Sequence, residues 1–434
     1  MKNKNGYVKI INNVFSFNDV KIGIMIRKML VFLGLMLCFV SVVRADEKKV
    51  ELIPVYEKTF EDTIVDVIFD TASVTIEEAK SMGWKEEGFS EMEKKQNKCE
   101  ILYPKVVILK KGKKKIIRFY EYNGKLKKTY ESGDYAEVVI SQNEKYIGVT
   151  TPTKIFEKEG YLTKFEMIDD NGNILWKIEG LGVGPYVPSP DGRLCIGTPS
   201  VEVENAPIEI FGKNGLVKKI ENPYGGWSGA FSNDGKYIAI AIRQSILWQE
   251  PAKGYLMLLD NNGGIIWERN DVGIISDISF SPKNNWIIFK CGSDTIRILT
   301  VFTIKGVKIF EIPGSMGSQS YFFSSKENEV AIINGQGYFW LVNLLNKKII
   351  TKLERKKERF RYISADKNFE KFVVGVYPNK IYIVNRKGNI LLEKEFSNIG
   401  FHGTPKMNLT DNFVKIAFSD EKDRIRIFII KKIY

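Results

Sequence analysis

Histidine and cysteine are scarce in this 434-residue chain: His402 is the only histidine, and the four cysteines are Cys38, Cys99, Cys195 and Cys291. One histidine excludes a zinc site built from several histidines and any triad that needs more than one. The cysteines lack the short spacings of metal or redox motifs. We therefore expect no metal and no cofactor. We expect the thiols to be buried and unreactive, and the alternative is that one pair of cysteines forms a disulfide in an oxidising compartment.

The apolar run from Met29 to Val43 is shorter than the roughly 20 residues that a membrane-spanning helix needs. It follows the basic segment Met25-Ile26-Arg27-Lys28 and precedes Val43-Arg44-Ala45, as in a secretory signal peptide. We expect residues 1–45 to be an N-terminal extension and signal peptide. The mature chain would then be extracytoplasmic, either periplasmic or secreted, with an anchored form as the alternative.

A large excess of positive charge is also absent from the mature chain. The net charge is +13, and removal of residues 1–45 leaves about +7. This mild basicity does not indicate nucleic acid. The lysine run from Lys110 to Lys115, broken by Gly112, is interpreted as a solvated turn. Proximity of these Lys-rich turns to an anionic membrane surface is the alternative.

What the chain does have is a repeat. The stretch Ser232-Asn233-Asp234-Gly235-Lys236-Tyr237-Ile238 is a turn between two apolar runs. Related turns begin at serines spaced roughly 40 to 49 residues apart, which is the period of a propeller blade. They begin at Ser141, Ser189, Ser232, Ser281, Ser324 and Ser364, with a weaker copy at Leu409.

A second turn recurs in step with the first. It is clearest in Asn171-Gly172-Asn173-Ile174-Leu175-Trp176 and Asn262-Gly263-Gly264-Ile265-Ile266-Trp267. Asparagine and glycine tolerate the positive φ of tight hairpin turns, so each repeat predicts four antiparallel strands. The Ser-Pro-Asp-Gly turn at Ser189 and the Gly-x-Ile-x-Trp strands resemble the blade motifs of WD-repeat and quinoprotein-type (PQQ-like) β-propellers. Quinoprotein dehydrogenases also carry a vicinal cysteine pair, which this chain lacks.

The sequence therefore predicts an all-β propeller of four-stranded antiparallel blades in a single domain, residues 46–434. We expect eight blades, with seven as the alternative count. The segment Tyr56 to Phe60 resembles the outermost strand Leu392 to Phe396, while the last repeat is short of one strand. Pairing of the N- and C-terminal strands would close the ring and hide a sheet edge.

The first blade differs from the others between two of its strands. Thr75 to Glu78 and Ser90 to Glu93 have the spacing of capping boxes, and Gly83 suits a helix end. We expect a helical insertion at about residues 73–98, with the next strand starting at Lys105. It is either a lid or docking arm, or a cap packed on one blade.

Candidate binding residues are aromatics in the longer loops, which we expect on one face of the ring. Such aromatics suit recognition of a protein, peptide or glycan. Packing against a neighbouring blade is the alternative for each of them. The candidates are Tyr186, Tyr224, Trp227, Trp248 and Phe401.

The sequence thus favours an exported, non-catalytic binding or assembly module that recognises a protein, peptide or glycan through this aromatic loop face. The alternative function is an extracytoplasmic hydrolase or transferase that uses His402, expected in a loop between blades. Aryl-sulfate transferring propellers have similar Gly-x-x-x-Trp strands and use an active-site histidine. No partner motif accompanies His402, so an enzyme is the less favoured class.

Overall fold

The computed structural model divides the chain into two compact units, Leu52–Lys431 and Met1–Glu51 with Lys432–Tyr434. The described residues are 50–156, 160–181, 186–197, 207–221, 227–244, 253–273, 275–292, 297–313, 319–366, 368–395, 401–410, 413–420 and 424–432. No helix among them is both long and apolar enough to cross a membrane.

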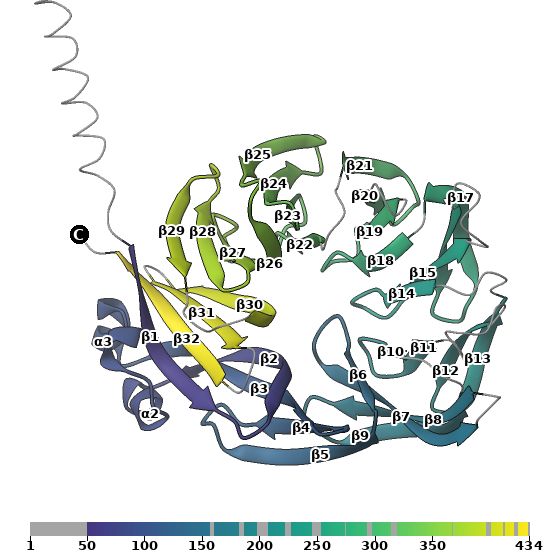
Figure 1. Cartoon of the computed structure of the whole chain (residues 1–434), viewed down its shortest axis with the longest axis horizontal. Helices are drawn as coiled ribbons and strands as arrows, with labels where there is room; N and C mark the ends of the chain where they lie inside the picture. The colour runs from purple at the N-terminus through teal and green to yellow at the C-terminus, as the bar shows by residue number, and fades with distance from the viewer. Residues whose placement is uncertain are drawn as a thin grey trace, which may run out of the picture. The chain divides into compact units, whose positions relative to one another are not determined.

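The strands of the described residues form eight four-stranded antiparallel sheets, the larger of the two blade counts considered from the repeat. In the unit Leu52–Lys431 the sheets follow one another around a ring (Figure 1). The first four sheets in chain order are β2 (Thr63–Val74), β3 (Cys99–Lys111), β4 (Lys114–Tyr120), β5 (Leu126–Asp134); β6 (Glu137–Ile140), β7 (Tyr146–Phe156), β8 (Gly160–Asp169), β9 (Ile174–Leu181); β10 (Val187–Pro188), β11 (Leu194–Gly197), β12 (Ile208–Gly212), β13 (Gly215–Ile220); and β14 (Trp227–Phe231), β15 (Tyr237–Gln244), β16 (Lys253–Asp260), β17 (Ile265–Gly273).

The remaining four sheets repeat this order, except for the last. They are β18 (Ile275–Phe280), β19 (Trp286–Gly292), β20 (Arg297–Thr303), β21 (Lys308–Pro313); β22 (Gln319–Phe323), β23 (Glu329–Asn334), β24 (Tyr338–Asn343), β25 (Lys348–Glu354); β26 (Arg359–Ala365), β27 (Lys371–Tyr377), β28 (Lys380–Asn385), β29 (Ile390–Glu395); and β30 (Phe401–Thr410), β31 (Phe413–Asp420), β32 (Arg424–Lys432) with β1 (Val50–Thr59). The all-β propeller prediction is confirmed.

A serine organises five of the first turns, whereas in the β26–β27 turn Asp366 rather than the expected Ser364 accepts the backbone N–H groups, those of Glu370 and Lys371. The Ser232 hydroxyl donates to Asp234 Oδ1 at 2.8 Å and accepts the backbone N–H of Tyr237 at 2.9 Å. Gly235 has a φ of +69°, a conformation that disfavours residues with a Cβ. The second turn uses a carboxylate instead, since Asp260 Oδ1 accepts the N–H groups of Asn262 and Gly264, both at 2.8 Å.

Hydrophobic clusters join neighbouring blades and form the core of the ring. The cluster between the β10–β13 and β14–β17 blades, for example, combines Ile208 and Ile210 with Ile240, Met257 and Leu259. Burial of such apolar faces contributes about 25 cal/mol per Å². A single four-stranded sheet cannot cover both of its own faces, so each blade depends on its neighbours for stability.

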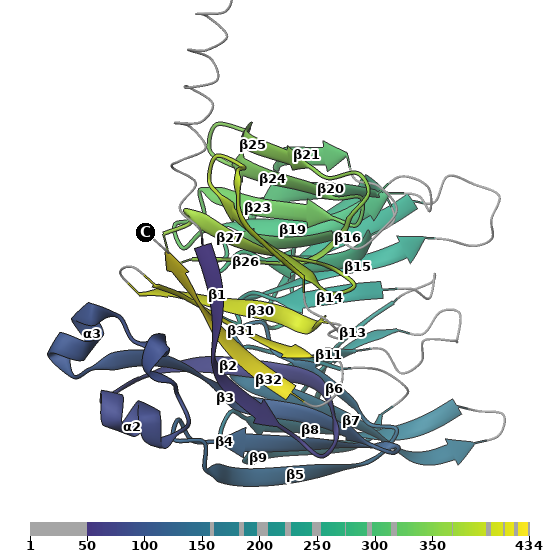
Figure 2. The same cartoon turned by 60° about the vertical axis from the view of Figure 1, so that its left-hand side comes forward.

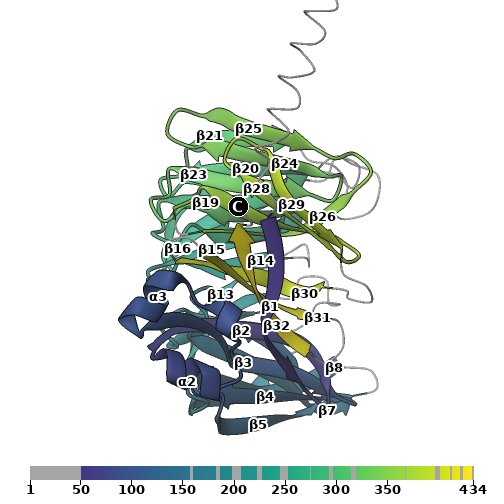
Figure 3. The ribbon, with the colours of Figure 1, turned by 90° about the vertical axis from the view of Figure 1, so that its left-hand side faces the viewer.

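The first and last described strands share one sheet, in the order β1-β32-β31-β30 (Figure 3). An ion pair between Glu57 Oε2 and Arg426 Nε, 3.1 Å long, ties β1 to β32. The predicted closure by N- and C-terminal strands is therefore confirmed.

The helical insertion lies between β2 and β3 and comprises α2 (Ile76–Ser81), a short 3-10 helix (Glu86–Gly88) and α3 (Glu91–Gln96) (Figure 2). Both predicted capping boxes form. The following strand starts at Cys99 rather than at the expected Lys105, because β2 and β3 pair as one long hairpin from Thr63–Lys110 to Val74–Cys99.

The insertion packs as a cap on β1. Trp84 stacks on Tyr56 with ring centroids 6.1 Å apart, and the Lys85 N–H donates to the Val55 carbonyl oxygen at 3.0 Å. The insertion's apolar residues Ile76, Ala79, Trp84 and Phe89 are buried in the same cluster as Val55. Met92 is its one exposed large hydrophobic residue among those described. The insertion thus covers the strand that closes the ring.

Candidate functional site

Tyr186 does not lie on an exposed loop face, so that expectation is wrong for this residue. Its side chain is fully buried between the β6–β9 and β10–β13 blades, with ring centroids 5.9 Å from Phe165 and 6.2 Å from Phe211. The ring occupies space left by Gly197, where a Cβ would come within 2.2 Å of it. Its hydroxyl is buried without a hydrogen-bond partner, and burial raises the pKa of Tyr186.

The other four aromatic candidates remain predictions. Tyr224 and Trp248 lie outside the described residues. Trp227 begins β14, where its backbone pairs with Ile242, and Phe401 begins β30. The side chains of Trp227 and Phe401 also lie outside what the structure describes.

His402 lies in a strand, not in the expected loop. It is the second residue of β30, the strand at the other edge of its sheet from β1, and its backbone pairs with Ser419. The pairing is irregular between His402 and Lys406. The His402 side chain lies outside what the structure describes, so the alternative function that uses it remains a prediction.

The carboxylates in the second turns accept hydrogen bonds from backbone N–H groups of the same turns. Asp169 Oδ1 accepts the N–H groups of Asn171 at 3.0 Å and Asn173 at 2.7 Å. Within the described residues, no three His, Cys, Asp or Glu side chains gather as a metal site would require. Cys99, Cys195 and Cys291 are buried, and no disulfide joins any two of them, which corrects the disulfide alternative for these three.

The lysine run forms the β3–β4 turn. Gly112 has a φ of +59°, Lys114 pairs with Glu131 at 2.8 Å, and Lys113 lies 4.9 Å from the Tyr135 ring centroid. The interpretation as a solvated turn therefore holds for the described geometry.

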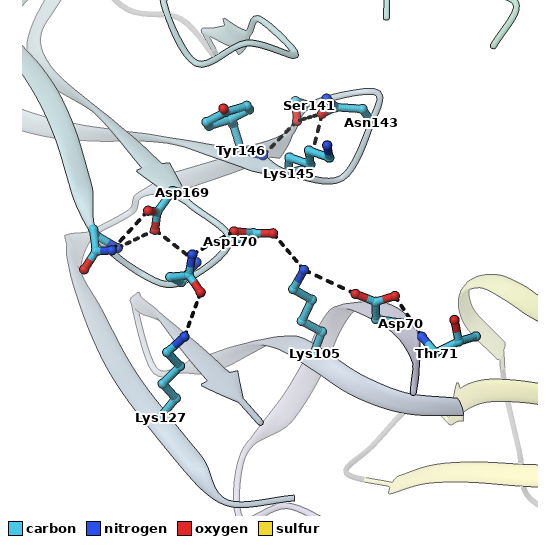
Figure 4. A network of polar contacts seen from close by, with 12 residues as sticks. Asp70, Thr71, Lys105, Lys127, Ser141, Asn143, Lys145, Tyr146, Asp169 and Asp170 are labelled. Atoms are coloured by element: carbon cyan, nitrogen blue, oxygen red, sulfur yellow. Dashed lines mark hydrogen bonds and ion pairs between the residues drawn. The ribbon is translucent and has the colours of Figure 1, made fainter. Parts of the chain in front are cut away.

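Polar contacts fix strands of one blade to a turn of the next blade (Figure 4). Lys105 Nζ lies 3.2 Å from an Asp70 oxygen within its own blade and 2.7 Å from Asp170 Oδ2 in the next blade. Lys127 donates to Asn171 Oδ1 at 2.7 Å. These contacts join the β2–β5 blade to the second turn of the β6–β9 blade.

Three tryptophans make a related contact between blades. Their indole N–H groups donate to turn carbonyl oxygens of the following blade. The bonds run from Trp176 to Gly192 at 2.7 Å, from Trp267 to Ile304 at 2.8 Å and from Trp286 to Glu327 at 2.7 Å. These bonds connect neighbouring blades at three places on the face carrying the first and second turns, here called the turn face.

The outermost strands expose aliphatic side chains close to this turn face. These residues follow the second turn of seven blades and are each 39–59% exposed. We call them the aliphatic belt: Leu126, Ile174, Leu175, Leu216, Val217, Ile265, Ile266, Val307, Ile349, Ile350 and Leu391. The signal was present in the sequence as a repeated aliphatic pair after the turn glycine. It was missed because such pairs also suit half-buried strands.

Two grooves lie between neighbouring blades along this belt. One, of about 550 Å³, is lined by Ile242, Met257, Leu259 and Ile265, with Lys218 also in the lining. The other, of about 480 Å³, lies between the β18–β21 and β22–β25 blades. Both volumes fall within the range of about 300–1,000 Å³ that is usual for ligand sites. The second is here called the Trp286 groove and is lined by Trp286, Ile304, Lys305, Val307, Lys326 and Leu345, among others.

The sequence matches no protein-family model and no curated protein. Solved structures do match the fold. The C-terminal WD40 domain of Sif2 has a TM-score of 0.51 at 11% identity, covering 86% of this chain and 99% of that domain. BamB from Moraxella catarrhalis has a TM-score of 0.51 at 12% identity, covering 87% of this chain and 99% of its own. The protein is a β-propeller, and its expected resemblance to WD-repeat and PQQ-like propellers is confirmed at the level of fold.

Proposed function

We propose that this chain is a non-catalytic protein-binding module that holds its partner on the turn face rather than on the aromatic loop face. The aliphatic belt is the observation that carries this proposal. Single exposed aliphatic residues are ordinary on protein surfaces, whereas contiguous apolar patches mark interaction sites. Here the exposed residues recur at equivalent positions of consecutive blades, and two grooves lie among them.

The rigidity of this face supports binding. The turns are tied together by the indole contacts of Trp176, Trp267 and Trp286 and by the Lys105 ion pairs. A surface that does not rearrange loses little conformational entropy when a partner binds. Buried apolar anchors in preformed pockets commonly dominate the energetics of protein interfaces.

The test compares capture of partners by matched variants. The tagged chain is crosslinked in its native source and its partners are quantified by mass spectrometry. We expect Ile265→Ser/Ile266→Ser with Ile349→Ser/Ile350→Ser to lose most of a partner that the unaltered chain captures. Tyr224→Ala/Trp248→Ala is the comparison for the loop face. Loss with this second variant alone would contradict the proposal and return binding to the loop aromatics.

We further propose that the protein works outside the cytoplasm after removal of residues 1–45. The basic segment Met25–Lys28, the apolar run and Ala45 support this. N-terminal sequencing of the protein isolated from its native source should begin at Asp46 or close to it. Recovery of the chain with residues 1–45 intact from the cytoplasmic fraction would contradict export.

A further inference from the structure

The Trp286 groove combines an apolar surface with a positive rim. Val307 directly follows the second turn of the β18–β21 blade and is 56% exposed, and Leu345 lies in the second turn of the β22–β25 blade and is 69% exposed. The partly buried Trp286 and Ile304 complete the apolar lining. An apolar side chain that enters this groove would cover aliphatic and aromatic surface that is otherwise in contact with water.

The exposed charges of the groove are positive. Lys305 and Lys326 line it and are exposed, and neither forms an ion pair with another described residue. Glu327 is the acidic residue of the lining, and both of its carboxylate oxygens are engaged. Lys347, which follows Leu345 closely in the chain, is exposed as well. The charges that the groove exposes to a ligand are therefore positive, whereas the Glu327 carboxylate is buried.

Glu327 holds the floor of the groove in place. It is 1% exposed, and its carboxylate accepts the N–H of Lys283 and, at 2.7 Å, Nδ2–H of Asn285. Its carbonyl oxygen accepts the Trp286 indole N–H at 2.7 Å. Three bonds from one residue thus fix the β22–β25 blade against the β18–β21 blade. The groove is formed before any ligand arrives, which lowers the cost of binding.

We propose that the Trp286 groove binds an acidic peptide segment of a partner protein, with one bulky apolar side chain inserted between Val307 and Leu345 and flanking Asp or Glu residues near Lys305 and Lys326. This inference rests on the proposed protein-binding function and names the chemistry of one of its contacts. The exposed lysines favour Asp or Glu residues beside the inserted side chain, and the apolar lining favours an inserted side chain that is itself apolar. A concave groove suits an inserted side chain better than it suits the flat surface of a membrane.

The experiment selects peptides from a random displayed library on the full folded chain. Enriched sequences are synthesised, and their affinities are measured by fluorescence anisotropy. We expect a single aliphatic or aromatic residue flanked by Asp or Glu, and we expect binding to weaken with added salt. Lys305→Glu/Lys326→Glu should weaken binding by at least about tenfold. Lys145→Glu/Lys387→Glu has the same change in charge on exposed turns outside the groove and should change affinity by less than about twofold.

A second variant tests the apolar anchor. Leu345→Ser removes exposed apolar surface, so it should leave folding intact and still weaken binding severalfold. Enrichment of no peptide, enrichment without an acidic bias, or equal loss in the control variant would each overturn the proposal. The proposal would also be overturned if no peptide is selected and the chain instead binds phosphatidylglycerol vesicles in a way that depends on Lys305 and Lys326. If partner capture still depends on the aliphatic belt in those cases, the protein-binding function stands and only the groove assignment fails.

Discussion

The Gln142 side-chain amide donates a hydrogen bond to the Phe280 carbonyl oxygen, although the two residues are 138 positions apart. Gln142 follows β6, and Phe280 ends β18. Two complete blades, β10–β13 and β14–β17, lie between these strands in the chain. The neighbouring Asn143 instead bonds the adjacent blade, donating to the Pro190 carbonyl oxygen at 2.7 Å. Consecutive residues of one turn therefore contact both the next blade and a blade further around the ring.

Replacement of Gln142 by alanine tests how much this long-range contact stabilises the ring. We expect Gln142→Ala to lower the free energy of unfolding by about 1 kcal/mol, the usual net value of one hydrogen bond. Gln336→Ala is the control, since Gln336 lies exposed in the turn between β23 and β24. Chemical denaturation measures both. Equal effects of the two substitutions would show that the Gln142 contact contributes nothing.

The Tyr186 hydroxyl is a buried polar group without a partner, so its removal should stabilise the protein. We expect Tyr186→Phe to raise the free energy of unfolding by about 1 kcal/mol at neutral pH, because folding no longer strips this hydroxyl of water. The measurement is denaturant unfolding of both proteins. A clear loss of stability would mean that the hydroxyl has a favourable contact after all.

The same residue gives a prediction about pH. Burial raises the pKa of Tyr186 and of the Cys195 thiol, so both stay neutral in the folded state. The unfolded groups lose protons near their ordinary pKa values of about 10 and 8.5. Stability should therefore be complete below about pH 8 and fall as pH rises, by up to about 1.4 kcal/mol per pH unit for each ionised group. A Tyr186→Phe/Cys195→Ala variant should lose less stability between pH 8 and 11, and an unchanged slope would contradict the assignment.

Substitutions at Gly192 and Gly124 distinguish two ways in which an added side chain destabilises the fold, namely backbone strain and steric overlap with a neighbouring ring. Both have positive φ values, +69° and +78°. A Cβ at Gly192 would come within 2.5 Å of the Tyr146 ring, whereas a Cβ at Gly124 would have nothing within 4 Å. We expect Gly124→Ala to cost about 1–2 kcal/mol from backbone strain alone. Gly192→Ala should cost about 1 kcal/mol more, measured by thermal unfolding. Equal costs would show that the Tyr146 ring moves aside freely.

The indole contacts between blades can be tested at Trp267. Trp267→Phe removes the N–H that bonds the Ile304 carbonyl oxygen and should cost about 2–4 kcal/mol through lost packing and an unpaired carbonyl. Trp340→Phe is the control, because Trp340 is buried but its indole N–H makes no hydrogen bond to another blade within the described part of the chain. The difference between the losses of unfolding free energy of the two variants estimates the contribution of the hydrogen bond between Trp267 and Ile304. No difference would assign the Trp267 effect to packing alone.

Turn chemistry explains why the fold could be predicted from the sequence. Ser232, Asp234 and Gly235 each perform a local task that depends only on nearby residues, so their pattern is readable in the chain. The pairing of β1 with β32 was predictable for a different reason, because one repeat lacked a strand and an isolated strand matched it.

The candidate site was less predictable because it depends on contacts between blades. Tyr186 has the glycine-rich surroundings of a loop aromatic, but its burial follows from the space beside Gly197 in another strand. The Trp286 groove requires the turns at Lys305 and Leu345 to face the same space, although they are separated by a whole repeat. No local pattern contains that information.

The pairing of β1 with β32 also has a consequence for biosynthesis, because the two strands are synthesised at different times. The ribosome makes β1 first and its partner almost last, so at roughly 5–20 residues per second β1 waits tens of seconds for β32. The Lys85–Val55 hydrogen bond and the Tyr56–Trp84 stack, in contrast, need only the first part of the chain. The insertion can therefore shield the waiting strand while synthesis continues. We expect chains that lack residues 75–98 to aggregate during translation even where their finished rings would be stable.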